Sequence, residues 1–141
     1  MYTPLLHFVW EMLQTPLFAQ MPTIAHWPAT LFCLRARVGD VATAVAAFGS
    51  VAALGRGRGW FLHPNRLSIA VYLVSGTLLR VALEIHALYW AHRWSYAGLM
   101  PAVPAIGVGL VPILQWIVLP LATTFLLQRH HVGVPAELRA S

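Results

Sequence analysis

The sequence predicts an all-α integral membrane protein: one domain built as a bundle of four transmembrane helices. Of its 141 residues, 59% are hydrophobic and only 9% are charged, and the mean hydropathy is +0.69. In a soluble domain about a quarter of the residues are charged, and they cover much of its surface. This chain has too few charged residues to do so. The apolar residues also fall in long runs. These observations exclude a soluble cytosolic enzyme, a nucleic-acid-binding module and a disordered chain.

The first span is expected at about residues 4–20, and it is the most polar of the four. It contains His7, Glu11, Gln14 and Pro16. A secretory signal peptide would begin with basic residues and continue as an uninterrupted apolar run. This segment does neither, so we expect it to be retained as part of the bundle.

The second span is expected at about residues 28–54. Pro28 suits the first turn of a helix because its missing N–H would have no partner there. Small side chains recur along this segment and predict a surface for close helix approach; they are Ala42, Ala46, Gly49, Ser50 and Ala53. The glycine- and arginine-rich stretch 55–59 then ends the helix.

The third and fourth spans are expected at about residues 67–91 and 101–127. The third contains two charged residues, Arg80 and Glu84. The fourth is interrupted by several helix-breaking residues, namely Pro104, Gly107, Gly109, Pro112 and Pro120. Broken helices of this kind often border a binding cavity in membrane proteins.

The arginines predict the orientation, because basic residues are enriched in cytoplasmic loops. A cytoplasmic N-terminus places five arginines inside: Arg56, Arg58, Arg66, Arg129 and Arg139. Arg93 then lies outside. We therefore expect both termini in the cytoplasm of a bacterial cell, with the protein in the inner membrane. Trp27, Trp90, Trp94 and Tyr96 are expected to form an outer aromatic belt.

Helical rise allows the depths of the charged residues to be compared. Asp40 lies 14 residues before Leu54, roughly 21 Å deep, and Arg80 lies 13 residues after Leu67, roughly 20 Å deep. Arg37 and Glu84 lie at a common depth of roughly 25 Å. The sequence therefore predicts a buried network of Arg37, Asp40, Arg80 and Glu84 between the second and third spans. Such a network either pins two helices together or carries function.

A second polar stripe is predicted on the first span. His7, Glu11 and Gln14 are spaced to share one helix face, and Gln115 of the fourth span is expected to meet Gln14. A metal site needs three or four converging ligands, and the histidines do not converge, so no metal site is predicted. The pattern identifies no cofactor. The candidate binding or proton-handling residues are Glu11, Gln14, Arg37, Asp40, Arg80, Glu84 and Gln115.

Three functions fit these residues. The first is binding of a small ligand or handling of protons, since a buried carboxylate can exchange a proton for a solute. In having four short helices with an acidic residue in the first, the chain resembles the small multidrug transporters. The second is acid–base catalysis on a lipid or isoprenoid. The order of Glu84, Trp94-Ser95-Tyr96 and Pro112 resembles membrane carotenoid cyclase-type proteins, although Gln115-Trp116 stands here where those proteins carry paired acids. The third is an accessory or assembly subunit of a membrane complex. The expected partners are the bilayer, a lipid or small hydrophobic ligand, and other membrane subunits.

Overall fold

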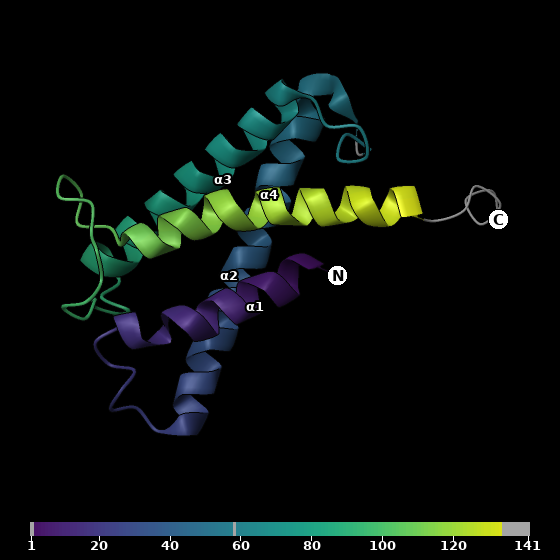
Figure 1. Cartoon of the computed structure of the whole chain (residues 1–141). Coiled ribbons are helices and arrows are strands. Elements are labelled where there is room, and N and C mark those ends of the chain that lie inside the picture. The colour runs from purple at the N-terminus through teal and green to yellow at the C-terminus, as the bar shows by residue number, and fades with distance from the viewer. Residues whose placement is uncertain (1, 58, 134–141) are drawn as a thin grey trace.

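The computed structural model describes residues 2–57 and 59–133, and helices joined by irregular connections make up this part of the chain (Figure 1). The helices are α1 (Tyr2–Gln14), α2 (His26–Val51), α3 (Arg66–Ile85) and α4 (Leu110–Gly133). Shorter helical turns extend three of them: η1 (Thr15–Leu17), η2 (Ala52–Arg56) and η3 (His86–Trp90). The described residues form no β-strand, only two isolated bridges.

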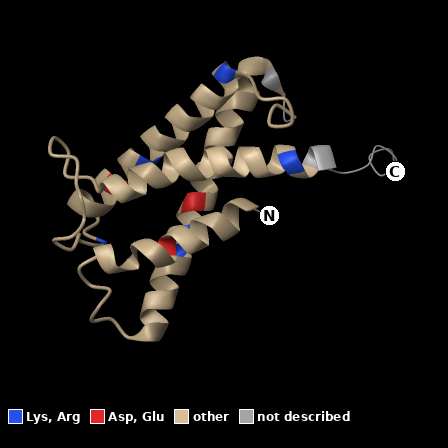
Figure 2. Ribbon diagram, in the orientation of Figure 1, with Lys and Arg blue, Asp and Glu red and all other residues tan. Residues whose placement is uncertain are grey.

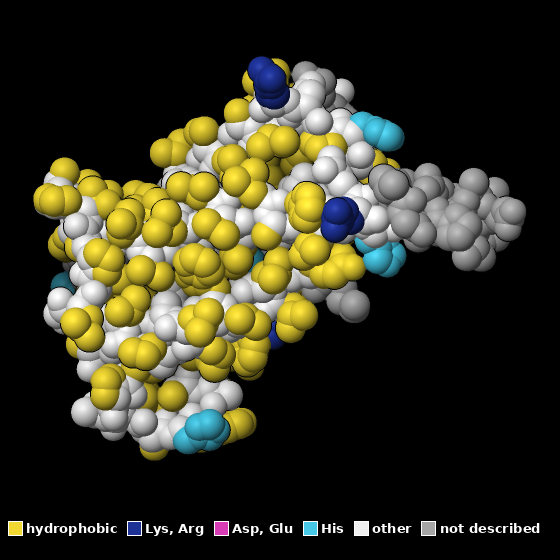
Figure 3. All heavy atoms as spheres, viewed as in Figure 1, with side chains coloured by type: hydrophobic (Ala, Val, Ile, Leu, Met, Phe, Trp, Pro, Cys, Tyr) yellow, Lys and Arg dark blue, Asp and Glu magenta, His cyan; other side chains and the backbone are white. Residues whose placement is uncertain are grey.

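Three helical segments are long and apolar enough to cross a membrane: His26–Gly55, Arg66–Trp90 and Leu110–His130. Hydrophobic side chains are spread over the whole length of the face seen in Figure 3, where no acidic side chain is visible. Three of the four acidic residues lie in the described part of the chain, and all three are buried. The bundle is therefore apolar outside and charged inside, the arrangement expected of a protein solvated by lipid.

The first predicted span is shorter than expected. α1 has 13 residues, whereas a span needs about 20. The helix ends because Pro16 cannot continue the ladder of backbone hydrogen bonds, and the Thr15 hydroxyl donates to the Glu11 carbonyl at 2.8 Å. A tight turn over Thr15–Leu17 and an irregular connection follow.

The last predicted span begins nine residues later than expected, at Leu110 rather than 101. The preceding connection, residues 91–109, is mostly irregular because Pro101 and Pro104 disrupt a helix and Gly107 adopts a positive φ of 64°. The chain turns back on itself there, with the Leu110 amide donating to the Pro101 carbonyl at 2.7 Å. Pro120, in contrast, is accommodated inside α4.

The helices pack as a ring in which α1 contacts α2 and α4, and α3 contacts the same two helices. Gly76 of α3 lies so close to Trp116 of α4 that an added Cβ would come within 2.9 Å of the indole. The expected small-residue surface of the second span is only partly used: the Ser50 hydroxyl donates to that of Ser75 at 3.0 Å, but Ala42, Ala46, Gly49 and Ala53 are exposed. That prediction was wrong for these four because α2 turns the face bearing Asp40, Thr43, Ala47 and Val51 inward.

The two loops at one end of the bundle form a cap. The Ala19 amide donates to the Ser95 carbonyl at 3.0 Å, and the Ala97 amide donates to the Leu17 carbonyl at 2.8 Å. A small apolar core of Phe18, Met21 and Met100 fills the space beneath them. At the other end, the rings of Tyr2 and His130 lie 6.3 Å apart, which brings the start of α1 close to the end of α4.

Candidate functional site

A buried ion-pair triad joins α2 to α3 at the level predicted from helical rise. Arg80 Nη1 donates to Asp40 Oδ1 at 3.0 Å, and Arg80 Nη2 pairs with Glu84 Oε1 one turn further along α3. All three side chains are buried, with Asp40 1% and Glu84 0% exposed. One guanidinium thus sits between two carboxylates with almost no access to water.

The amide of Gln115 connects this triad to α1. Its Nε2 atom lies 3.0 Å from His7 Nδ1, 3.3 Å from Glu11 Oε1 and 3.4 Å from Asp40 Oδ2. His7 Nδ1 also lies 3.5 Å from that Asp40 oxygen. Gln115 was expected to meet Gln14, and that prediction was wrong. The register of α1 against α4 instead brings the amide to His7 and Glu11, one to two turns nearer the N-terminus.

Glu84 is held from its other side by the cap. Tyr96 Oη donates to Glu84 Oε2 at 2.7 Å, and Trp94 Nε1 donates to the same oxygen at 3.2 Å. The two residues were predicted to lie in an aromatic belt, but the connection folds inward and turns both rings toward α3. Burial, and then the neighbouring Glu84 carboxylate, raise the pKa of the Tyr96 phenol well above its ordinary value.

Two predicted site residues lie apart from these contacts. The Arg37 guanidinium stacks over the Phe8 ring, 5.5 Å from its centroid, and does not pair with Glu84. Depth alone suggested that pair, but Arg37 lies about 60° around the helix from Asp40, because successive residues rotate by about 100°. Gln14 is 2% exposed, and both its side-chain polar atoms lack a hydrogen-bond partner among the residues described.

We call the connected side chains the polar cluster. Its members come from all four helices and the cap, and they are His7, Glu11, Asp40, Arg80, Glu84, Trp94, Tyr96 and Gln115. Figure 2 shows acidic residues midway along α1 and α2 and toward the cap end of α3. The polar cluster contains three carboxylic acids and one guanidinium, so full ionisation with His7 neutral would leave a net charge of −2 inside the protein.

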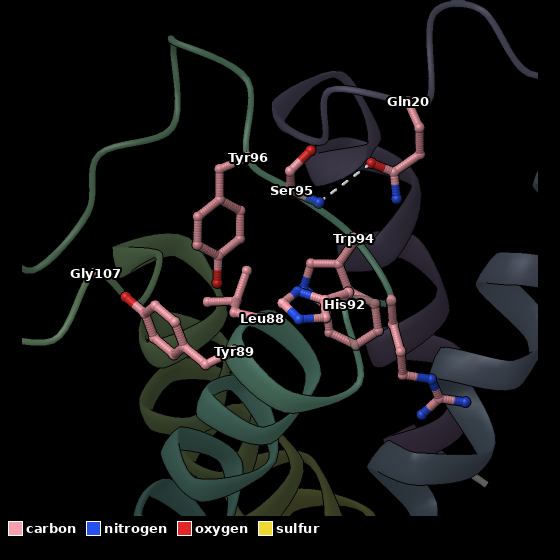
Figure 4. Close-up of a pocket in the computed structure, with 9 residues that line it drawn as sticks. Gln20, Leu88, Tyr89, His92, Trp94, Ser95, Tyr96 and Gly107 are labelled. Atoms are coloured by element: carbon pink, nitrogen blue, oxygen red, sulfur yellow. Dashed lines mark hydrogen bonds between the residues drawn. The ribbon is translucent and has the colours of Figure 1, made fainter.

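Two cavities reach the Glu84 end of the polar cluster. A cavity of about 530 Å³ lies under the cap, where Tyr89, His92, Trp94 and Tyr96 surround it (Figure 4). Gln20 also borders it and accepts a hydrogen bond from the Ser95 amide at 3.4 Å. The two donors to Glu84, Trp94 and Tyr96, therefore also border a space open to the outside of the protein.

The second cavity, of about 290 Å³, is a cleft between α2 and α3. Arg80 and Glu84 form part of its wall, and the side chains of Phe32, Leu83 and Trp94 make it largely apolar. The cleft therefore brings a space beside the α2–α3 surface into contact with two members of the ion-pair triad, Arg80 and Glu84. No three His, Cys, Asp or Glu side chains in the described ranges are placed together to hold a metal ion.

The fold and the site define a helical bundle of membrane-protein composition built around buried charge. No protein-family model, curated protein or solved structure significantly matches the chain. His7, Trp94 and Tyr96 were absent from the predicted site. The spacing of His7 from Glu11 did signal a shared face, whereas nothing in the local sequence distinguishes Trp94 and Tyr96 from interfacial aromatics.

Proposed function

We propose that this chain is an integral membrane protein whose polar cluster binds and releases protons, coupled to occupation of a cavity beside Glu84. The observation that carries the proposal is the imbalance of buried charge: three carboxylic acids share one guanidinium. The effective cost of taking an ion from water into a protein interior is several kcal/mol even after relaxation. A net charge of −2 is therefore unfavourable here, and the polar cluster is expected to hold protons at neutral pH.

Arg80 connects the two ends of the polar cluster through its charge rather than by transferring a proton. A guanidinium stays protonated in proteins and cannot relay a proton, so it separates Glu84 and Tyr96 on one side from Asp40 and Glu11 on the other. It responds instead by charge: neutralising Glu84 leaves Arg80 fully available to Asp40. A proton or ligand that arrives at the Glu84 end of the polar cluster thereby changes the electrostatic environment of the side chains on α1 and α4 that contact Asp40.

We further propose a multi-pass arrangement in the bacterial inner membrane, with both termini cytoplasmic. α1 is too short to span by itself, but α1 and η1 together run from Tyr2, which neighbours His130, to the cap where Phe18 pairs with Tyr96. Their 16 residues rise roughly 24 Å. In this proposed arrangement the chain crosses between the two ends four times. Arg66 and Arg129 lie at the end proposed to face the cytoplasm, which agrees with the enrichment of basic residues in cytoplasmic loops.

Infrared titration of the purified protein in lipid nanodiscs tests the proton-binding proposal. We expect a carboxylic-acid carbonyl band that disappears as the pH is raised, and we expect Glu11→Gln, Asp40→Asn and Glu84→Gln each to change its intensity or midpoint. Ser50→Ala is the matched control, because Ser50 also bridges α2 and α3 through a partly buried hydroxyl pair but lies outside the polar cluster. Absence of this band at every pH would refute proton binding and leave the polar cluster with only a structural role in holding the helices together.

An intramembrane acid catalyst acting on an isoprenoid is the second candidate. The observation that favours it is the group of aromatic rings beside Glu84: Trp94 lies 6.2 Å from Phe18 and 5.7 Å from Phe32, and Tyr96 lies 5.7 Å from Phe18. Aromatic faces stabilise cations, and a protonated carboxyl group can donate to an alkene. Product formation from an acyclic carotenoid, lost in Glu84→Gln, would select this function over reversible proton binding.

A further inference from the structure

We propose that the cleft between α2 and α3 is a binding site for the phosphate headgroup of an anionic membrane lipid. The proposal goes beyond proton binding, because such a site requires no proton exchange by the polar cluster. It rests on the arginines around the cleft, on their lack of protein counter-ions and on the apolar surface beside it.

Three arginines from two helices and the cap border the same cavity. Arg80 lies at its base, and Arg35 and Arg93 also line it. Arg80 is 6% exposed, and its Nε atom has no hydrogen-bond partner in the described part of the protein although its two terminal nitrogens are engaged. A buried N–H donor without a partner costs free energy, so the arginine that lines the base of the cleft has one donor not used by the protein.

The charge of the cleft is positive. Arg35 and Arg93 are exposed, and neither forms an ion pair with any carboxylate in the described residues, because all three of those carboxylates belong to the polar cluster. Glu84 also lines the cleft, so the lining holds three arginines and one carboxylate. Two uncompensated guanidinium groups remain, and guanidinium is the side chain best suited to bidentate binding of phosphate oxygens.

The surroundings favour a lipid over a free anion. A volume of about 290 Å³ accommodates a headgroup but not a complete lipid. Beside the cleft, α2 and α3 expose aliphatic side chains, with Val38 67% and Leu83 45% exposed, and these provide a surface for an acyl chain. In the proposed orientation the cleft opens near the outer membrane surface, at the depth where headgroups lie.

Lipid titration followed by native mass spectrometry tests this site, with dioleoyl-phosphatidylglycerol as the anionic probe and dioleoyl-phosphatidylcholine as the zwitterionic one. We expect wild-type protein to retain phosphatidylglycerol preferentially. We expect Arg35→Gln/Arg93→Gln to weaken that retention at least tenfold, since each arginine contributes a charge-assisted hydrogen bond. The control, Arg66→Gln/Arg129→Gln, removes the same charge from exposed positions at the other end of the bundle and should leave retention within about twofold of wild type.

Gly39→Leu provides a second variant that keeps every charge. Gly39 lines the cleft, and its Cβ position has nothing within 4 Å, so a leucine fills the cleft without a clash at Cβ. It should also lower retention. Equal losses in both double-arginine variants, or unchanged retention in Arg35→Gln/Arg93→Gln and Gly39→Leu, would overturn the site. Displacement of the lipid by inorganic phosphate would overturn the lipid assignment and leave a site for soluble anions.

Discussion

The hydrogen bond between Tyr96 and Glu84 offers a direct test of how strongly the cap is fastened to the polar cluster. Tyr96→Phe keeps the ring that packs 5.7 Å from Phe18 and removes only the donor 2.7 Å from the carboxylate. A hydrogen bond to a charged group contributes about 1.5–3 kcal/mol. We expect Tyr96→Phe to lower the free energy of unfolding by that amount.

Glu84→Gln preserves the shape of the side chain and removes its charge. Arg80 then keeps only Asp40 as a partner, and breaking a buried ion pair from one side costs about 3–5 kcal/mol. The glutamine carbonyl still accepts from Tyr96, but a bond between neutral groups contributes only about 0.5–1.5 kcal/mol. The double variant should therefore lose about 1 kcal/mol less than the sum of the two single variants.

Reversible unfolding in mixed micelles of a mild detergent and sodium dodecyl sulfate measures all four proteins of this cycle. A coupling energy below about 0.3 kcal/mol, the level seen for independent sites, would refute the inference that Tyr96 donates to an ionised Glu84. Leu88→Ala, a change in η3 that borders the cap cavity but adds no polar contact, provides a comparison for nonspecific loosening of this end.

Three further outcomes follow from the geometry. Gly76→Ala should destabilise the bundle by about 1–3 kcal/mol through overpacking against Trp116. The control Gly39→Ala, with open space around its Cβ, should be neutral or stabilise the protein by up to about 1 kcal/mol. Equal effects of the two substitutions in the same unfolding assay would argue against a close approach of α3 and α4. Arg37→Gln should cost less than about 1 kcal/mol, since it loses only a cation–π contact; a loss as large as that of Arg80→Gln would place Arg37 in the polar cluster after all. Because the folded protein raises the pKa of Tyr96, folding retains a proton that the unfolded chain releases above about pH 10, so stability should be constant below that pH and fall above it. The fall should be smaller in Tyr96→Phe when unfolding is measured across that range, and an identical pH profile would contradict the burial of the phenol.

The ion pairs within the polar cluster could be predicted only in part from the sequence. The distance of Asp40 and Arg80 from their shared loop predicted a common depth, and the two are hydrogen-bonded at 3.0 Å. The same arithmetic failed for Arg37, because depth does not specify the face of a helix. The face is set by how α2 rotates against α1 and α3 at once, and that rotation depends on packing across the whole bundle.

The connections were predicted less well than the helices. Residues 101–109 are apolar and suggested the start of a span, yet prolines and a positive-φ glycine fold them into the cap. Trp94 and Tyr96 suit a membrane interface by composition, and only the pairing of Phe18 with Tyr96 across the cap turns them toward Glu84. Such contacts join residues far apart in the chain and leave no periodic signal in the sequence.

The sequence by itself predicted helices long and apolar enough to cross a membrane, and it predicted charge within the bundle. Carboxylates among apolar runs are expected to face inward, since lipid does not solvate charge. The tertiary structure alone decided which partners those carboxylates have. Gln115 reaches His7, Glu11 and Asp40, and the cap reaches Glu84, because hydrogen bonds form over about 3 Å and distances that short are fixed by the mutual rotation and register of four helices.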